Sequence, residues 1–186
     1  MTGSKHGVYD DLPWIEPLKE FLRAARAARV PQIGICFGHQ IMAEAFGGRA
    51  EKSERGWGCG VHRYTTLGRA GWCRQAPESF TMHAMHQDQV TALPDDATVL
   101  ATSDFCPYAM VAYGDPEEPH AISIQPHPEF DATFAAALLE RRSGVAVPEE
   151  LATRALATVH DPVDGTAFAR WSLDYVRQSL AARRAA

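Results

Sequence analysis

The sequence predicts an α/β protein built on an open, mostly parallel sheet. A short apolar strand at residues 32–36 passes through a tight glycine turn into a helix at residues 39–46, an order typical of parallel α/β sheets. More short strands are predicted downstream, and helices follow them. At 186 residues the chain is long enough for one domain with a sizeable core and short for two. We therefore expect residues 1–186 to form a single domain.

The remaining elements follow from local patterns. Residues 1–13 are predicted to be a loop, and residues 14–29 a helix with Ile15, Leu18 and Leu22 at helical spacing. Glycines at 47–48 end the helix at 39–46, because glycine favours the position after a helix C-terminus. Further strands are expected at 57–66, 97–102, 108–113 and 120–125. Helices are expected at 131–142, 148–159 and 166–184, and the apolar stripe Phe168, Trp171 and Tyr175 of the last one is predicted to be core.

Composition excludes several classes of function. The net charge of −5 argues against a broad grip on nucleic acid or an anionic membrane surface. No apolar run approaches the roughly 18 residues of a spanning helix, and the N-terminus lacks the apolar centre of a signal peptide. The cysteines at 36, 59, 73 and 106 form no CxxC pair, so we expect a reduced, cytoplasmic protein.

Cys36 lies in the frame GICFG, between the predicted strand and helix. Glycines two residues before and after it allow the cramped backbone that a nucleophile elbow needs. The helix that follows directs its N-terminal dipole at the sulfur, which favours a thiolate, and the N–H of Phe37 can serve as an oxyanion donor. The alternative is a packed structural cysteine, since cysteines are often buried.

The stretch QPHPEF at residues 125–130 offers a base and an acid that could orient it. A cysteine nucleophile needs a base to accept and return a proton, and a third group commonly orients that base. His127 and Glu129 are expected on a turn at the carboxyl edge of the sheet, where open α/β sheets place their active sites. The two stretches together predict a Cys–His–Glu triad.

GICFGHQ followed far downstream by QPHPEF resembles the class I, triad-type glutamine amidotransferases. The resemblance spans about residues 2–131, with lesser blocks at TGSKHGVYDDLPWI, GWGCGVH and HQDQVTALPDDATVLATSDFCPYAM. These blocks are similar to the stand-alone branch related to the glutaminase domain of GMP synthetase, a branch that also includes enzymes cleaving γ-glutamyl peptides. The resemblance implies a three-layer α/β/α sandwich, flavodoxin-like or Rossmann-like, with no metal or cofactor.

By position, the resemblance makes Cys36 the nucleophile, His127 the general base and acid, and Glu129 the orienting carboxylate. Gly3 matches the family's oxyanion loop, so its N–H would act with that of Phe37. Substrate contacts are implied at Gln40, His86, Gln87 and Asp88.

The resemblance begins late in the family pattern. Members of the family have strands and a helix before the loop that TGSKHG represents. The sequence therefore predicts a sheet without its first strands, either truncated or completed by another chain, since a sheet with uncovered edges exposes unpaired backbone.

Two histidine patterns have other interpretations. His83 and His86, three residues apart, could be metal ligands on a helix, although no third ligand is evident. His39 could compete with His127 as the base, but its position favours capping or packing at the start of a helix.

The leading functional hypothesis is hydrolysis of the γ-glutamyl amide of glutamine through a thioester, with ammonia passed to an unknown acceptor. One alternative is a γ-glutamyl peptidase or hydrolase of the same fold, and another is a non-catalytic binding or regulatory module. The expected ligand is a small molecule, glutamine or a γ-glutamyl compound, and the expected protein partner is a synthetase or a second copy of the chain.

Overall fold

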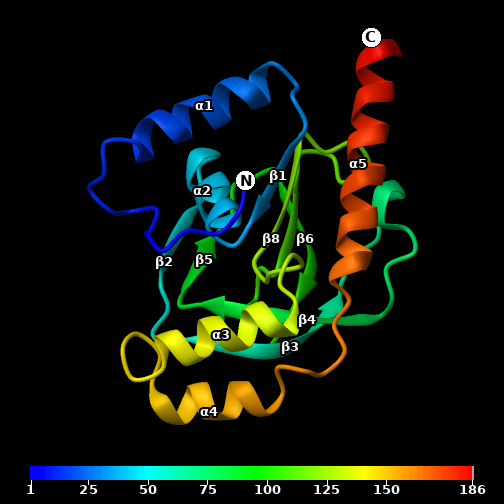
Figure 1. Ribbon diagram of the computed structural model, residues 1–186. Coiled ribbons are helices and arrows are strands. Elements are labelled where there is room, and N and C mark those ends of the chain that lie inside the picture. Colours follow the sequence, from blue (N-terminus) through cyan, green and yellow to red (C-terminus); the bar gives the residue numbers. More distant parts are fainter. Residues whose placement is uncertain (186) are drawn as a thin grey trace.

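The computed structural model describes residues 1–185 and places a curled six-stranded sheet between helical layers (Figure 1). The sheet contains β1 (Gln32–Ile35), β3 (Gly58–Thr66), β4 (Ser79–His86), β6 (Ala97–Thr102), β7 (Met110–Tyr113) and β8 (Ala121–Ile124), in the order β1-β8-β7-β6-β3-β4. Helices α1 (Ile15–Ala27) and α2 (Phe37–Ala45) pack on one face, and α5 (Gly165–Ala185) packs on the other. The predicted α/β class and layered architecture are confirmed.

The prediction of a mostly parallel sheet is wrong. Within residues 1–185, β1 and β8 form the one parallel strand pair of this sheet, and the other neighbouring strands run antiparallel. The physical reason is the length of the connections. Residues 103–109 and 114–120 join β6 to β7 and β7 to β8, and connections this short reverse the chain, whereas a parallel pair needs a longer crossover.

Three strands were not predicted from the sequence. β2 (Arg49–Lys52) and β5 (Asp88–Ala92) form a separate antiparallel ribbon, and β4 pairs with β3 along almost its whole length. β4 contains His83 and His86, so the helix expected for a metal-binding pair is wrong. Residues three apart on a strand point to opposite faces of the sheet. The side chains of His83 and His86 therefore cannot bind the same metal ion.

The last two helices before α5 lie beyond the β3–β4 end of the sheet (Figure 1). α3 (Ala132–Arg142) begins at Asp131, whose carboxylate accepts a hydrogen bond from the Phe134 N–H at 2.7 Å. α4 (Glu149–Ala157) packs against β3 and α3. No helix in the described part of the chain is long and apolar enough to cross a membrane.

Helix α5 packs on the sheet through an aromatic stripe, and one tyrosine of this stripe also forms hydrogen bonds to the sheet. Phe168, Trp171 and Tyr175 are buried, which confirms the predicted core stripe. The Tyr175 hydroxyl donates to the His120 carbonyl at 2.7 Å and accepts from the Gln32 N–H at 3.1 Å. A single hydroxyl thus ties α5 to the start of β1 and to the residue before β8.

Replacing Tyr175 with phenylalanine is expected to lower the free energy of unfolding by about 1–3 kcal/mol, because it leaves buried backbone groups without partners. Urea denaturation measures this loss. Tyr64 provides the matched control, since its buried hydroxyl has no hydrogen-bond partner within residues 1–185. Tyr64→Phe should therefore be neutral or stabilising, and equal losses in the two variants would contradict the role of the Tyr175 hydroxyl.

Candidate active site

Cys36 occupies a strained turn between β1 and α2. Its backbone has φ of 53° and ψ of −105°, a region that non-glycine residues rarely adopt and that costs of order 1–3 kcal/mol. The flanking glycines make the turn feasible. A Cβ atom on Gly34 would lie 2.6 Å from the Gly38 carbonyl oxygen, and one on Gly38 would lie 2.6 Å from the Met1 carbonyl oxygen. The GxCxG frame is therefore required by close backbone packing around the cysteine.

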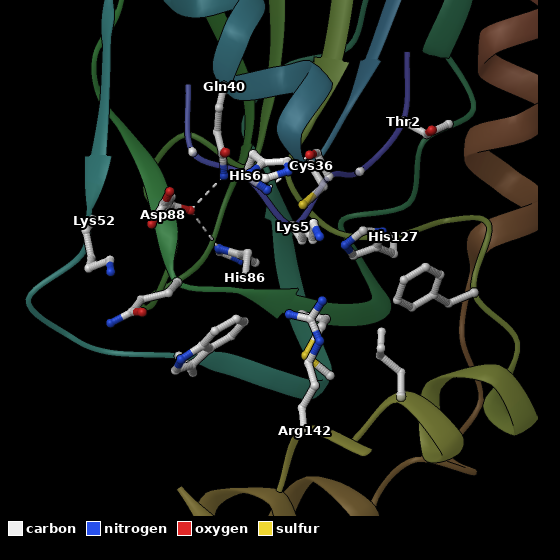
Figure 2. Close-up of a pocket in the computed structure, with 18 of the residues that line it drawn as sticks. Thr2, Lys5, His6, Cys36, Gln40, Lys52, His86, Asp88, His127 and Arg142 are labelled. Carbon is white, nitrogen blue, oxygen red and sulfur yellow. Dashed lines mark hydrogen bonds between the residues drawn. The ribbon is translucent and has the colours of Figure 1, made fainter. Parts of the chain in front are cut away.

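His127 and Glu129 lie beside this turn, just after β8. His127 Nδ1 is 2.9 Å from Glu129 Oε1, and the His127 backbone N–H donates to the His83 carbonyl at 2.9 Å. Figure 2 shows the His127 ring next to the Cys36 sulfur. A carboxylate on Nδ1 holds that nitrogen protonated, which leaves Nε2 free to exchange a proton.

Gly3 belongs to the same site although it comes from the N-terminal loop. A Cβ atom there would lie 3.0 Å from His127 Cε1 and 3.9 Å from Cys36 Sγ, so the Gly3 backbone lies against both residues. The start of this loop is anchored beside β1, because the Met1 ammonium donates to the Ile33 carbonyl at 2.7 Å. Phe37, the other expected oxyanion donor, is the first residue of α2.

The surroundings of His127 favour its protonated form. Burial lowers its pKa, but hydrogen bonds to the Cys36 thiol and the Glu129 carboxylate, together with their charges, outweigh burial and raise the pKa to about 9. Such a shift is typical of an imidazole placed to hold a proton between a sulfur and a carboxylate.

Glu129→Gln is expected to lower the pKa of His127, because the carboxylate that stabilises the imidazolium is removed. An NMR titration of the His127 ring measures this pKa directly, with Glu140→Gln on the exposed side of α3 as the control.

The raised pKa also makes stability depend on pH. In the wild type the pKa of His127 in the folded protein, about 9, exceeds the unfolded value of about 6.5. The stabilisation from His127 is thus complete below pH of about 6.5 and is lost as pH rises through about 9. Equal His127 titrations in Glu129→Gln and wild type would contradict the pairing.

A cavity of about 610 Å³ opens beside Cys36 and His127 (Figure 2). All four residues expected to contact substrate line it: Gln40, His86, Gln87 and Asp88. The Gln40 amide nitrogen donates to the Asp88 carbonyl at 2.8 Å, and the Tyr9 hydroxyl donates to the Asp88 carboxylate at 2.9 Å. These bonds hold one polar wall of the cavity in place.

Two further histidines near the site, His86 and His39, are buried and neutral. His86 Nδ1 lies 3.1 Å from the Asp88 carbonyl and so donates to it, and burial lowers the pKa of His86 to about 3. His86 Nε2 is buried and has no hydrogen-bond partner among residues 1–185. His39 is fully buried with Nδ1 2.7 Å from the Ser123 hydroxyl, and burial lowers its pKa to about 3. His39 therefore packs at the start of α2, as predicted.

Sequence reasoning missed one wall of the cavity, which is formed by α3 and by the residues just before α3 and β3: Trp57, Phe130, Phe134, Leu138 and Arg142. From Phe130 to Arg142 these residues follow one another at intervals of four, but such a stripe on a helix does not by itself distinguish a cavity wall from core packing. No cluster of three or more metal-binding side chains occurs within residues 1–185. Cys59, Cys73 and Cys106 are buried, and burial raises the pKa of each thiol.

Comparisons with known proteins agree with this geometry. The sequence pattern of the family described as "Glutamine amidotransferase class-I" matches residues 7–143. Gamma-glutamyl peptidase 3 of Arabidopsis thaliana is 31% identical over 166 residues, which cover 86% of this chain and 65% of the peptidase. This chain thus spans a little under two thirds of that relative.

A glutamine-hydrolyzing GMP synthase of Photorhabdus laumondii is 35% identical over 122 residues, which cover 61% of this chain and 23% of that synthase. The crystal structure of a glutamine amido transferase from Methylobacillus flagellatus shares the fold, with a TM-score of 0.75 at 22% identity over 96% of this chain and 74% of that one. Because the family pattern covers well over half of the sequence, the chain belongs to the class I glutamine amidotransferase family.

Proposed function

We propose that this protein hydrolyses γ-glutamyl amides with a Cys36–His127–Glu129 triad. The observation that carries the proposal is the placement of His127, bonded to Glu129 at 2.9 Å, beside a cysteine held on a strained strand-to-helix turn. A cysteine that served only as core packing would need neither the strained backbone nor the buried histidine next to it.

The reaction follows from these positions. His127 already holds the proton that Cys36 gives up, as its raised pKa favours. The Cys36 sulfur attacks the γ-carbonyl carbon, and the resulting oxyanion accepts hydrogen bonds from the N–H groups of Phe37 and Gly3. The carbon–nitrogen bond then breaks, His127 protonates the departing amine, and a γ-glutamyl thioester remains. His127 next removes a proton from water, the water oxygen attacks the thioester, and glutamate leaves as the thiol is restored.

The polar wall suits the glutamyl end of the substrate. The Asp88 carboxylate can accept hydrogen bonds from the α-ammonium group, and Gln40 holds the Asp88 backbone in position. Lys52 also lines the cavity and supplies a positive charge for the α-carboxylate. His86 and Gln87 also line this wall of the cavity.

Two leaving groups fit this chemistry, ammonia from glutamine and the amine of a γ-glutamyl peptide. Transfer of ammonia requires a synthetase partner, and the relative from Photorhabdus laumondii is named as a glutamine-hydrolyzing synthase. The resemblance to gamma-glutamyl peptidase 3 supports the peptide alternative. Four free cysteines fit a reducing compartment, for which we propose the cytoplasm.

A chloroketone analogue of glutamine tests the proposal, because it alkylates a thiol that is held where the γ-carbonyl binds. Peptide mass spectrometry should find the adduct on Cys36 and on none of the other three cysteines, and free glutamine should slow the labelling. The variant Cys36→Ser should remain unlabelled. Well-folded wild-type protein without an adduct would instead support a non-catalytic binding module.

A further inference from the structure

One face of α3 lines the active-site cavity. Phe134, Leu138 and Arg142 of α3 follow one another at intervals of four residues, and Phe130 lies just before the helix; all four line the cavity, and we call them the α3 wall. The adjoining face of the helix packs into the core through the buried residues Ala135 and Leu139, and Leu138 lies between the cavity and this core. Phe134 is 52% exposed, and an exposed phenylalanine in a cavity wall is surface that a bound apolar group can cover.

The α3 wall begins at the group that would protonate the departing amine. The Phe130 ring stacks on the His127 ring at 4.0 Å between centroids, and Phe134 packs edge-on against Phe130 at 4.7 Å. The scissile nitrogen must lie within reach of His127, so any substituent on that nitrogen extends along the α3 wall. The polar wall at Gln40 and Asp88 is left for the glutamyl end.

Arg142 places a positive charge at the far end of the wall. Its guanidinium lies 5.8 Å from the centre of the Trp57 ring, a contact that restrains the side chain. Within residues 1–185 no carboxylate forms an ion pair with Arg142, and Figure 2 shows its head group rising toward the space below Cys36. A carboxylate on the leaving group would satisfy this cation, and arginine is well suited to bind one.

We propose that the α3 wall and Trp57 bind the leaving group of a γ-glutamyl substrate, and that this group is an amine bearing an apolar, preferably aromatic, side chain and a carboxylate. A γ-glutamyl dipeptide such as γ-glutamyl-phenylalanine has this chemistry. The inference rests on the proposed function for the orientation of the substrate. Ammonia, the leaving group of glutamine, would make no contact with the wall.

Calorimetric binding to the Cys36→Ala protein tests the inference without turnover. We expect γ-glutamyl-phenylalanine to bind at least about tenfold more tightly than γ-glutamyl-glycine or glutamine, because only its side chain covers Phe134. Arg142→Met should lower the affinity for γ-glutamyl-phenylalanine by about tenfold. The affinity for γ-glutamyl-phenethylamide, which lacks the carboxylate, should change by less than about twofold. Phe134→Ala should weaken both aromatic ligands.

Two substitutions serve as matched controls in the same background. Arg141→Met changes the neighbouring exposed arginine of α3, and Phe21→Ala changes a phenylalanine on α1 that is 66% exposed and lies outside the cavity. Both should leave every affinity unchanged. Circular dichroism spectra confirm that each variant is folded before its affinity is compared.

Several results would overturn the inference. Equal affinities for γ-glutamyl-phenylalanine and γ-glutamyl-glycine would contradict an apolar subsite for the leaving group. The absence of binding by any of these ligands would contradict it as well. A loss of glutamine binding in Arg142→Met would show that Arg142 contacts the glutamyl end of the substrate and not the leaving group. Hydrolysis by the wild type separates the two proposals. Cleavage of all these substrates at equal rates would overturn only the proposed role of the α3 wall. Preferential binding of γ-glutamyl-phenylalanine without cleavage would overturn only the proposed activity.

Discussion

Replacing Cys36 with alanine is expected to lower kcat for a γ-glutamyl substrate by about 10⁴-fold or more. Loss of the nucleophile removes the covalent route, and what remains is catalysis by the oxyanion donors and by binding. The fold should persist, because alanine retains the Cβ atom at the strained turn and lacks only the sulfur. A coupled enzymatic assay that detects the released glutamate measures the rate.

A second variant makes this expectation sharper. If Cys36 and His127 act as one unit, His127→Gln should cost about as much as Cys36→Ala, and the double variant should be no slower than either. Cys59→Ala is the control, since Cys59 is buried in the core between β3 and α4. Activity within tenfold of wild type in Cys36→Ala would exclude a nucleophilic role.

The sequence predicted most helices and the strand-turn-helix around Cys36, because these depend on local patterns. The stripe of α5 repeats at helical spacing, and Gly34 and Gly38 record a close backbone approach. Sheet direction could not be predicted in the same way. It depends on which strands meet in space, and the pairing of β1 with β8 joins segments almost ninety residues apart, Gln32 with Ala121.

β4 illustrates how burial hides a strand. Its residues from Met82 to His86 are all buried, so apolar and polar residues do not alternate along it as they do on a half-exposed strand. The histidines within it resembled a ligand pair at helical spacing. The backbone of this stretch is paired with β3 along its length and with His127 at His83, which fixes it as a strand.

Some residues of the candidate site could likewise be located from local sequence patterns, and others could not. Cys36, His127 and Glu129 could be located because they lie in two short stretches with recognisable chemistry, and the structure brings them together. The α3 wall could not be located from its residues alone, because a stripe of Phe134 and Leu138 on a helix normally indicates core packing. Only the position of α3 beside the cavity shows that this stripe faces a ligand space.

The largest effect on stability and activity together is expected from Gly34→Ala. The added Cβ atom would lie 2.5 Å from Met42 Sδ and 2.6 Å from the Gly38 carbonyl oxygen. The methionine end can move, but the carbonyl belongs to the first turn of α2, and its displacement shifts the turn that carries Cys36. We expect the free energy of unfolding to fall by about 3 kcal/mol. We also expect kcat to fall by about 100-fold, because the sulfur moves relative to His127.

Gly68→Ala separates this effect from the general cost of losing a glycine. Its Cβ atom would meet only the end of the Leu100 side chain, Cδ2 at 3.1 Å, which can rotate away, so the free energy of unfolding should change by less than about 1 kcal/mol. Adding Met42→Ala to Gly34→Ala tests which contact matters. Since the carbonyl contact remains, the double variant should keep the lowered kcat of Gly34→Ala. Recovery of wild-type kcat would show that the sulfur contact alone, and not the backbone of the turn, makes glycine necessary before Cys36.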